Sequence, residues 1–123
     1  MTIMGALDHI DKIKPNTYSQ SEKIRWLSEL DGTVKTAIID THEGGENIHF
    51  GGYTEETSLT TELLVPFPHD ILYIHYLEMQ IDYANAEYTK YENSHALYNT
   101  AYTDFARYYN RTHMPKGTKF KFF

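Results

Sequence analysis

Histidine is the residue type in this chain with the clearest potential for chemistry, since seven histidines occur and cysteine is absent. His75 and Glu78 lie three residues apart, so both would sit on one face of a helix. His69 and His75 are six residues apart rather than the four of a zinc-protease helix. His42 and His49 have no better-spaced partner. These spacings favour capping or solvated histidines over a metal site.

Paired carboxylates are the second candidate for chemistry, because two acids in different surroundings can act as general acid and general base. Glu55 and Glu56 are adjacent in a polar stretch, while Glu78 and Asp82 lie one helical turn apart. No phosphate-binding loop or serine-nucleophile motif accompanies them. We therefore predict that the chain is not an enzyme and requires no cofactor, and we assign Glu55 and Glu56 to contacts made by a loop.

Tyrosine is the most unusual component of the chain, with eleven copies, nine of them between Tyr73 and Tyr109. Tyrosine is a good boundary residue, because its ring packs while its hydroxyl stays in water. Nine tyrosines in one stretch exceed what a small core can bury, and aromatic side chains concentrate binding energy at protein interfaces. We predict that several form a subunit or partner interface, and five fall at expected helix margins: Tyr83, Tyr91, Tyr98, Tyr108 and Tyr109.

The elements that position these side chains are expected to be four helices in an all-α fold. Apolar residues recur at helical spacing over residues 2–14, 21–41, 69–91 and 95–111. Ser19 and Glu22 match a capping box before the second helix. Asn93 and Ser94 offer a break between the last two helices. These two would form an antiparallel hairpin that dominates the fold.

Two segments lack the helical period. Residues 42–66 form a long irregular loop with two Gly-Gly pairs, in which residues 48–50 and 63–65 are either short strands or extended arms. Residues 113–123 form an extended arm in which lysine alternates with Phe120, Phe122 and Phe123. Exposed phenylalanines on a short arm indicate docking on a partner. We expect one domain over residues 1–123, with its helical body at 2–112.

Composition excludes several functional classes. The net charge of −6 argues against a protein that grips nucleic-acid phosphates over a broad surface. No apolar run approaches the ~20 residues that a membrane span requires, and charged residues interrupt the N-terminal segment. We expect a soluble, intracellular product with no membrane partner.

Several runs of residues are similar to a known family. They are Trp26-Leu27-Ser28-Glu29-Leu30, Glu62-Leu63-Leu64-Val65-Pro66, Tyr76-Leu77-Glu78, Gln80-Ile81-Asp82-Tyr83-Ala84-Asn85, Glu87-Tyr88, Asn93-Ser94 and Phe105-Ala106-Arg107-Tyr108-Tyr109-Asn110-Arg111-Thr112-His113-Met114-Pro115. In these runs the chain resembles the small head–tail connector (adaptor or neck) proteins of tailed bacteriophages and of prophages in Gram-positive bacteria. The C-terminal run is the most specific of them.

The resemblance implies a structural virion protein without enzyme activity or cofactor. Such a subunit would form a ring of about a dozen copies beneath the portal protein. The ring would extend the DNA channel, let DNA pass without specific binding, and offer an attachment surface for tail-completion or tail-terminator proteins. The resemblance places the protein at the head–tail interface of the virion, and in the host cytoplasm during assembly.

One alternative from another class stays open. A small cytoplasmic helical regulator could use the same Tyr-rich hairpin against a single protein partner. A metal-dependent helical-bundle enzyme is a more distant reading. Formation of a ring distinguishes a connector from a regulator, because a regulator would give persistent one-to-one complexes.

Overall fold

The computed structural model describes residues 1–117, and this part of the chain is mostly helical and contains no strand. The expected all-α fold is therefore confirmed. Phe120, Phe122 and Phe123 of the expected arm lie outside the described residues. The helices of the described part are α1 (Ile3–Ile13), α2 (Gln20–Ala37), α3 (Ile71–Ala84) and α4 (Tyr88–Thr112), with two short 3-10 helices, η1 (Ile39–Thr41) and η2 (Gly45–Asn47).

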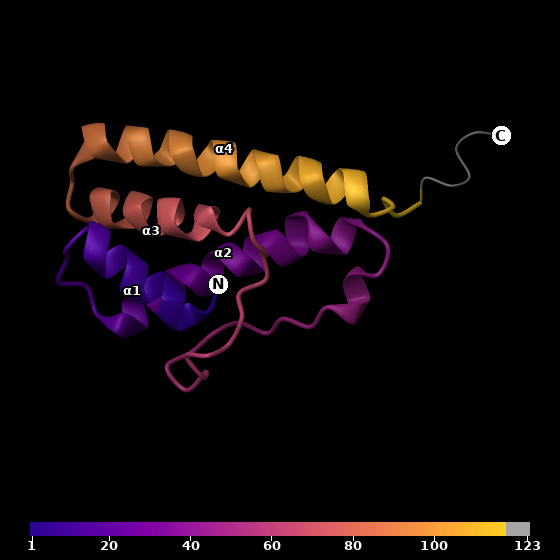
Figure 1. The fold of residues 1–123 in the computed structure, drawn as a ribbon, viewed down its shortest axis with the longest axis horizontal. Helices are drawn as coiled ribbons and strands as arrows, with labels where there is room; N and C mark the ends of the chain where they lie inside the picture. Colours follow the sequence, from indigo (N-terminus) through magenta and orange to yellow (C-terminus); the bar gives the residue numbers. More distant parts are fainter. Residues whose placement is uncertain (118–123) are drawn as a thin grey trace.

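Helix α3 is the centre of the arrangement (Figure 1). α4 runs antiparallel beside it, and α1 and α2 pack against α3 from the other side. A helix covered from several sides needs apolar residues on several faces. This accounts for the many buried side chains of α3, whereas α4 buries only one stripe. The buried α3 residues are Leu72, Tyr73, Ile74, Leu77, Met79, Ile81 and Asp82, and those of α4 are Ser94, Ala101, Phe105 and Tyr109.

The turn between α3 and α4 lies at residues 85–87, so the predicted break at Asn93–Ser94 is wrong. Ala86 adopts a left-handed conformation, with φ of 57°, which reverses the chain directly after α3. Ser94 is instead buried within α4, where its Oγ donates to Asp82 Oδ2 at 2.8 Å. The hydroxyl also contacts the carbonyl of Lys90 one turn earlier, as serines within helices commonly do.

Of the expected capping box at the N-terminus of α2, the bond to Ser19 forms and the carboxylate of Glu22 binds elsewhere. Ser19 Oγ accepts a hydrogen bond from the backbone N–H of Glu22 at 3.1 Å, while the carboxylate of Glu22 pairs with Arg25. At its other end α2 stops at Ala37, earlier than the predicted residue 41. The chain continues as η1, against which Gly45 packs so closely that an added Cβ would lie 2.4 Å from a backbone oxygen of η1.

A buried carboxylate fastens the long loop to the helical body. Asp31 of α2 is fully buried and accepts hydrogen bonds from the Tyr53 hydroxyl at 2.5 Å, the Tyr73 hydroxyl at 2.6 Å and the backbone N–H of Leu64 at 3.1 Å. Burial raises the pKa of the Asp31 carboxyl, and the three donors oppose that rise. Residues 48–50 and 63–65 form no strand, which removes one of the two alternatives for these segments. The long loop is irregular, and side-chain hydrogen bonds hold it against the helices.

Candidate interaction surface on the helical hairpin

Three tyrosines gather at the turn of the hairpin, and we call them the turn cluster: Tyr83, Tyr88 and Tyr91. The rings of Tyr83 and Tyr88 have centroids 6.1 Å apart, and those of Tyr83 and Tyr91 are 5.4 Å apart. Tyr83 and Tyr88 are each 59 % exposed, whereas Tyr91 is half-buried. The cluster is therefore a preformed aromatic surface that faces solvent.

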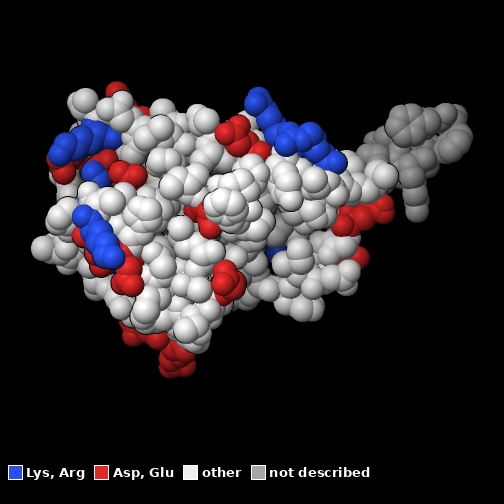
Figure 2. All heavy atoms as spheres, viewed as in Figure 1, with Lys and Arg blue, Asp and Glu red and all other residues white. Residues whose placement is uncertain are grey.

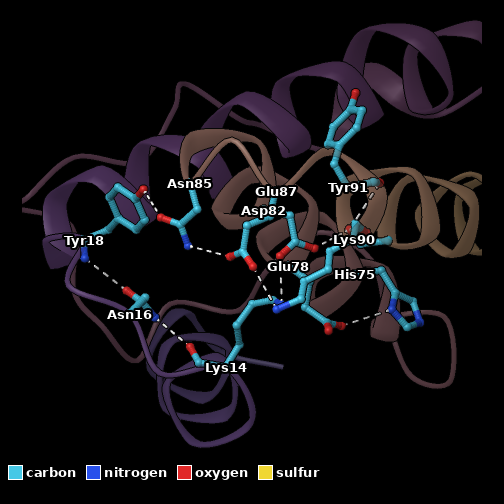
Figure 3. A network of polar contacts seen from close by, with 11 residues as sticks. Lys14, Asn16, Tyr18, His75, Glu78, Asp82, Asn85, Glu87, Lys90 and Tyr91 are labelled. Atoms are coloured by element: carbon cyan, nitrogen blue, oxygen red, sulfur yellow. Dashed lines mark hydrogen bonds and ion pairs between the residues drawn. The ribbon is translucent and has the colours of Figure 1, made fainter.

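A polar network behind the turn cluster fixes the turn to the N-terminal half of the molecule (Figure 3). Lys14 Nζ lies 2.8 Å from Asp82 Oδ1, and the other carboxylate oxygen of Asp82 receives the Ser94 hydroxyl. The Tyr18 hydroxyl donates to Asn85 Oδ1 at 2.5 Å. Because these bonds join α3 to α4 and to the segment between α1 and α2, they hold the turn that carries the turn cluster in a fixed position.

Sequence reasoning placed Tyr83 and Tyr91 correctly at the hairpin margin but missed Tyr88, their third neighbour. It also missed the network that supports them. The only available signal was the position of Asp82 beside the apolar stripe of α3, where a carboxylate requires a partner if it is buried.

The predicted interface residue Tyr98 lies in a second aromatic group, inside the hairpin. Its ring centroid is 5.1 Å from that of Tyr76 and 5.9 Å from that of Tyr102. All three rings are partly buried and pack against the core. Burial raises the pKa of each hydroxyl, Tyr98 most clearly. Tyr98 thus contributes mainly to packing between α3 and α4.

The last two predicted tyrosines lie near the C-terminal end of α4. Tyr109 is only 6 % exposed, so its expected position at an open margin is wrong. Its ring stacks on His113 with centroids 3.7 Å apart and meets His42 edge-on at 4.9 Å. Tyr108 is partly buried, and its ring lies 4.8 Å from that of His69. Tyr109 lies on the buried stripe of α4, and His42 from the preceding loop covers its ring further.

The remaining predicted contact residues lie elsewhere. Glu55 and Glu56 are exposed in a turn of the long loop, where they have no contact with the turn cluster. Acidic side chains are visible at the lower edge of the molecule, over this loop (Figure 2). Phe120, Phe122 and Phe123 fall beyond the residues that the structure describes.

The histidines do not assemble a metal site within residues 1–117, where no three His, Asp or Glu side chains converge. His75 Nδ1 lies 3.4 Å from Glu78 Oε1 and has no closer polar partner. Glu92 and His95 form a Glu-x-x-His pair on α4, but the imidazole of His95 packs on Tyr91 with centroids 5.6 Å apart. His42 is buried, with hydrogen bonds to backbone and to Asn110.

A second apolar surface lies between the beginning of α3 and the middle of α4. It is a groove of about 380 Å³ with an apolar lining that includes Pro68, Ile71, Leu97 and Ala101. Ile71 is 42 % and Leu97 52 % exposed, and Phe67, which precedes Pro68 in the chain, is 84 % exposed. We call this surface the α3–α4 groove.

Comparison with protein-family models, with curated proteins and with solved structures found no match to this chain. Within the described residues, every helix is too short or too polar to cross a membrane. The features of the chain that bear on function are therefore the two apolar surfaces of the hairpin and the sequence runs described above.

Proposed function

We propose that this protein is a structural subunit of a phage head–tail connector, which assembles into a ring under the portal protein and carries the tail-attachment surface. The observation that carries the proposal is the presence of two separate exposed apolar surfaces on one small subunit, the turn cluster and the α3–α4 groove. Exposed apolar patches on a soluble chain mark interaction sites.

The position of these surfaces favours repeated contacts over a single pair. Tyr88 begins α4, and the groove contacts α4 at Leu97 to Asp104. At 1.5 Å per residue, the two surfaces are about 14–24 Å apart along the helix. A symmetric dimer through one surface would leave the other exposed, whereas head-to-tail contacts that close into a ring can cover both.

The charge of the subunit is compatible with a DNA channel. Each copy carries −6, so a ring of many copies would repel DNA phosphates rather than hold them. Figure 2 shows Asp and Glu side chains spread over several parts of the visible face, with Lys and Arg in small separate groups. Such a surface supports passage of DNA better than retention of DNA.

The test is direct imaging of the assembly. The purified chain, alone and mixed with the portal protein encoded in the same genome, is examined by negative-stain electron microscopy. We expect rings of about a dozen copies that add a layer to the portal. A mixture without added density on the portal, or a stable one-to-one complex with another protein, would overturn the proposal, and the second result would favour a regulator.

A matched pair of variants connects the rings to the turn cluster. Tyr83→Ser combined with Tyr88→Ser removes two exposed aromatic side chains and should abolish assembly of the oligomeric ring without loss of helix content. Met4→Ser, which removes an exposed apolar side chain from α1, serves as the control because Met4 is 44 % exposed. Rings that survive the tyrosine substitutions would show that another surface holds the subunits together.

A further inference from the structure

The α3–α4 groove is lined by apolar side chains, by the polar side chains of His69, His75 and Thr100, and by the carboxylate of Asp104. Asp104 lines the groove and is exposed, and within residues 1–117 it makes no ion pair or hydrogen bond. The nearby Phe67 presents almost its entire ring to solvent. The ligand that would complete this site therefore carries both aromatic rings and positive charge.

The chain contains one segment with that chemistry, at its C-terminal end. Residues 116–123 include three lysines and three phenylalanines and no acid. From Lys119 to Phe122 the two types alternate, so in an extended peptide the rings would point to one side and the ammonium groups to the other. Such a segment can place rings into an apolar groove while a lysine approaches a carboxylate at its edge.

The C-terminal part of the chain is positively charged and the rest is negatively charged. Residues 105–123 carry five Lys or Arg and no Asp or Glu, which leaves a net charge of −11 on residues 1–104. In Figure 2 basic side chains gather above the C-terminal half of α4, which Figure 1 places at the upper right. The C-terminal segment of one copy is therefore attracted to the helical body of another.

The groove of the same copy is a poor destination for this segment. Met114 and Lys116 are held beside η1 by hydrogen bonds with Glu43 and Thr41 of 2.8 and 3.1 Å. From the end of α4, the groove lies about 12–22 Å back along the helix. Six residues beyond Gly117 span at most about 20 Å, so on folding back the segment would reach the near end of the groove but could not fill the groove to its far end. The segment of a second copy is not limited by this distance, because its own α4 need not lie beside the groove.

We propose that the α3–α4 groove binds the Lys-Phe segment, residues 116–123, of a second copy of this chain. The inference deepens the proposed ring and rests on it, because it names the contact by which one subunit holds the next. The contact joins two different surfaces, so it propagates from copy to copy and adds to the subunit contacts proposed for the turn cluster.

Disulfide trapping tests the contact directly, since the chain has no cysteine of its own. Thr100→Cys places a thiol on the wall of the groove, and Phe123→Cys places one on the segment while all three lysines and the other two phenylalanines remain. Equal amounts of the two variants are mixed under mild oxidation. We expect a covalent dimer of twice the 14.4 kDa chain mass, in which mass spectrometry finds both substituted positions in one linked peptide pair.

Matched variants control for chance collisions. Thr89→Cys is exposed on α4 outside the groove, and its crosslinking with Phe123→Cys should be about tenfold slower. Leu97→Asp in the groove variant should slow the specific crosslink by about tenfold, because it removes an exposed apolar contact from the lining. Asp104→Lys should slow it, and Lys119→Glu with Lys121→Glu on the partner should restore part of the rate.

Equal rates for Thr100→Cys and Thr89→Cys would overturn the inference. A chain carrying both Thr100→Cys and Phe123→Cys that closes only on itself at low and high concentration would also overturn it. The outcome is distinguishable from failure of the connector proposal. Rings that form normally when Phe120, Phe122 and Phe123 are replaced by serine would refute the tail contact alone, whereas specific crosslinks without rings on the portal would refute the connector role alone.

Discussion

The hydrogen bonds around Asp31 attach the long loop to the helices, and their contribution to the stability of the fold can be tested by substitution. Tyr73→Phe removes one hydroxyl that makes two buried hydrogen bonds, donating to Asp31 at 2.6 Å and accepting from the backbone N–H of Val65 at 2.7 Å. Loss of a bond to a carboxylate costs about 1.5–3 kcal/mol, and the unsatisfied N–H adds about 1–3 kcal/mol. We expect a decrease of about 3–5 kcal/mol in the free energy of unfolding.

Tyr53→Phe is a second variant of the same cluster, for which a smaller loss of stability is expected. The Tyr53 hydroxyl makes a single bond, to the other oxygen of Asp31, and the side chain is slightly more exposed than that of Tyr73. We expect a loss of about 1.5–3 kcal/mol, smaller than that of Tyr73→Phe. The double variant should lose less than the sum of the two, because both hydroxyls bind the same carboxylate.

The assay is equilibrium unfolding in urea, followed by the fluorescence of Trp26. This is the only tryptophan of the chain, it is buried in α2, and its ring meets Tyr18 edge-on at 5.6 Å. Tyr98→Phe is the control, since within the described residues its hydroxyl has no hydrogen bond, and it should change the free energy by less than about 0.5 kcal/mol. A Tyr73→Phe variant as stable as this control would refute the role assigned to the Asp31 cluster.

Four further variants are examined by the same measurement. Gly45→Ala should cost about 1–3 kcal/mol, because its Cβ would meet an η1 oxygen at 2.4 Å, while Gly51→Ala, with open space around it, should change little. Ser94→Ala should cost about 1–3 kcal/mol by leaving an oxygen of the buried Asp82 with one donor fewer. The raised pKa of Asp31 contributes stability that is complete below its ordinary value of 3.8 and is lost as pH rises through the folded-state value. The free energy of unfolding of the wild type relative to that of Asp31→Asn should therefore fall as pH rises. A difference between the two proteins that stays constant with pH would contradict this expectation.

The helices could be predicted because their signals are local. Apolar residues at helical spacing marked the regions of α1 and α2, and Ser19 correctly identified the beginning of α2 through its hydroxyl. Such patterns need only the residues within one or two turns of one another. For the same reason, the end of α2 was predicted less well, since the change to η1 depends on the close approach of Gly45 from the following loop.

The position of the hairpin turn could not be predicted from local signals. Asn93 and Ser94 favour a break by their intrinsic preferences, but Asp82 on the neighbouring helix supplies an acceptor for the Ser94 hydroxyl. The actual turn places Ala86 at positive φ, a conformation that alanine rarely adopts. Contacts between α3 and α4 therefore override the local preferences, and these contacts are absent from any short window of sequence.

The exposure of some tyrosines could be predicted from the sequence, and their positions less well. The excess of tyrosine correctly indicated aromatic rings beyond the needs of the core, because Tyr83 and Tyr88 are each 59 % exposed. Tyr109 was misplaced since the cover over its ring comes from His42, which is 67 residues earlier in the chain. The Asp31 cluster was missed altogether, because its donors come from α3 and from the loop.

The tyrosines of this protein serve two purposes that must be separated before its function is tested. Tyr73 and Tyr53 hold the fold through their hydroxyls, so replacing them would disrupt any assembly indirectly. Among residues 1–117 the side chains of Tyr83 and Tyr88 make only ring contacts, at an exposed turn, so a loss of assembly on their replacement would report on the interface itself. An excess of tyrosine in a sequence therefore indicates an interface only after the buried hydroxyls have been assigned to the partners that they bind.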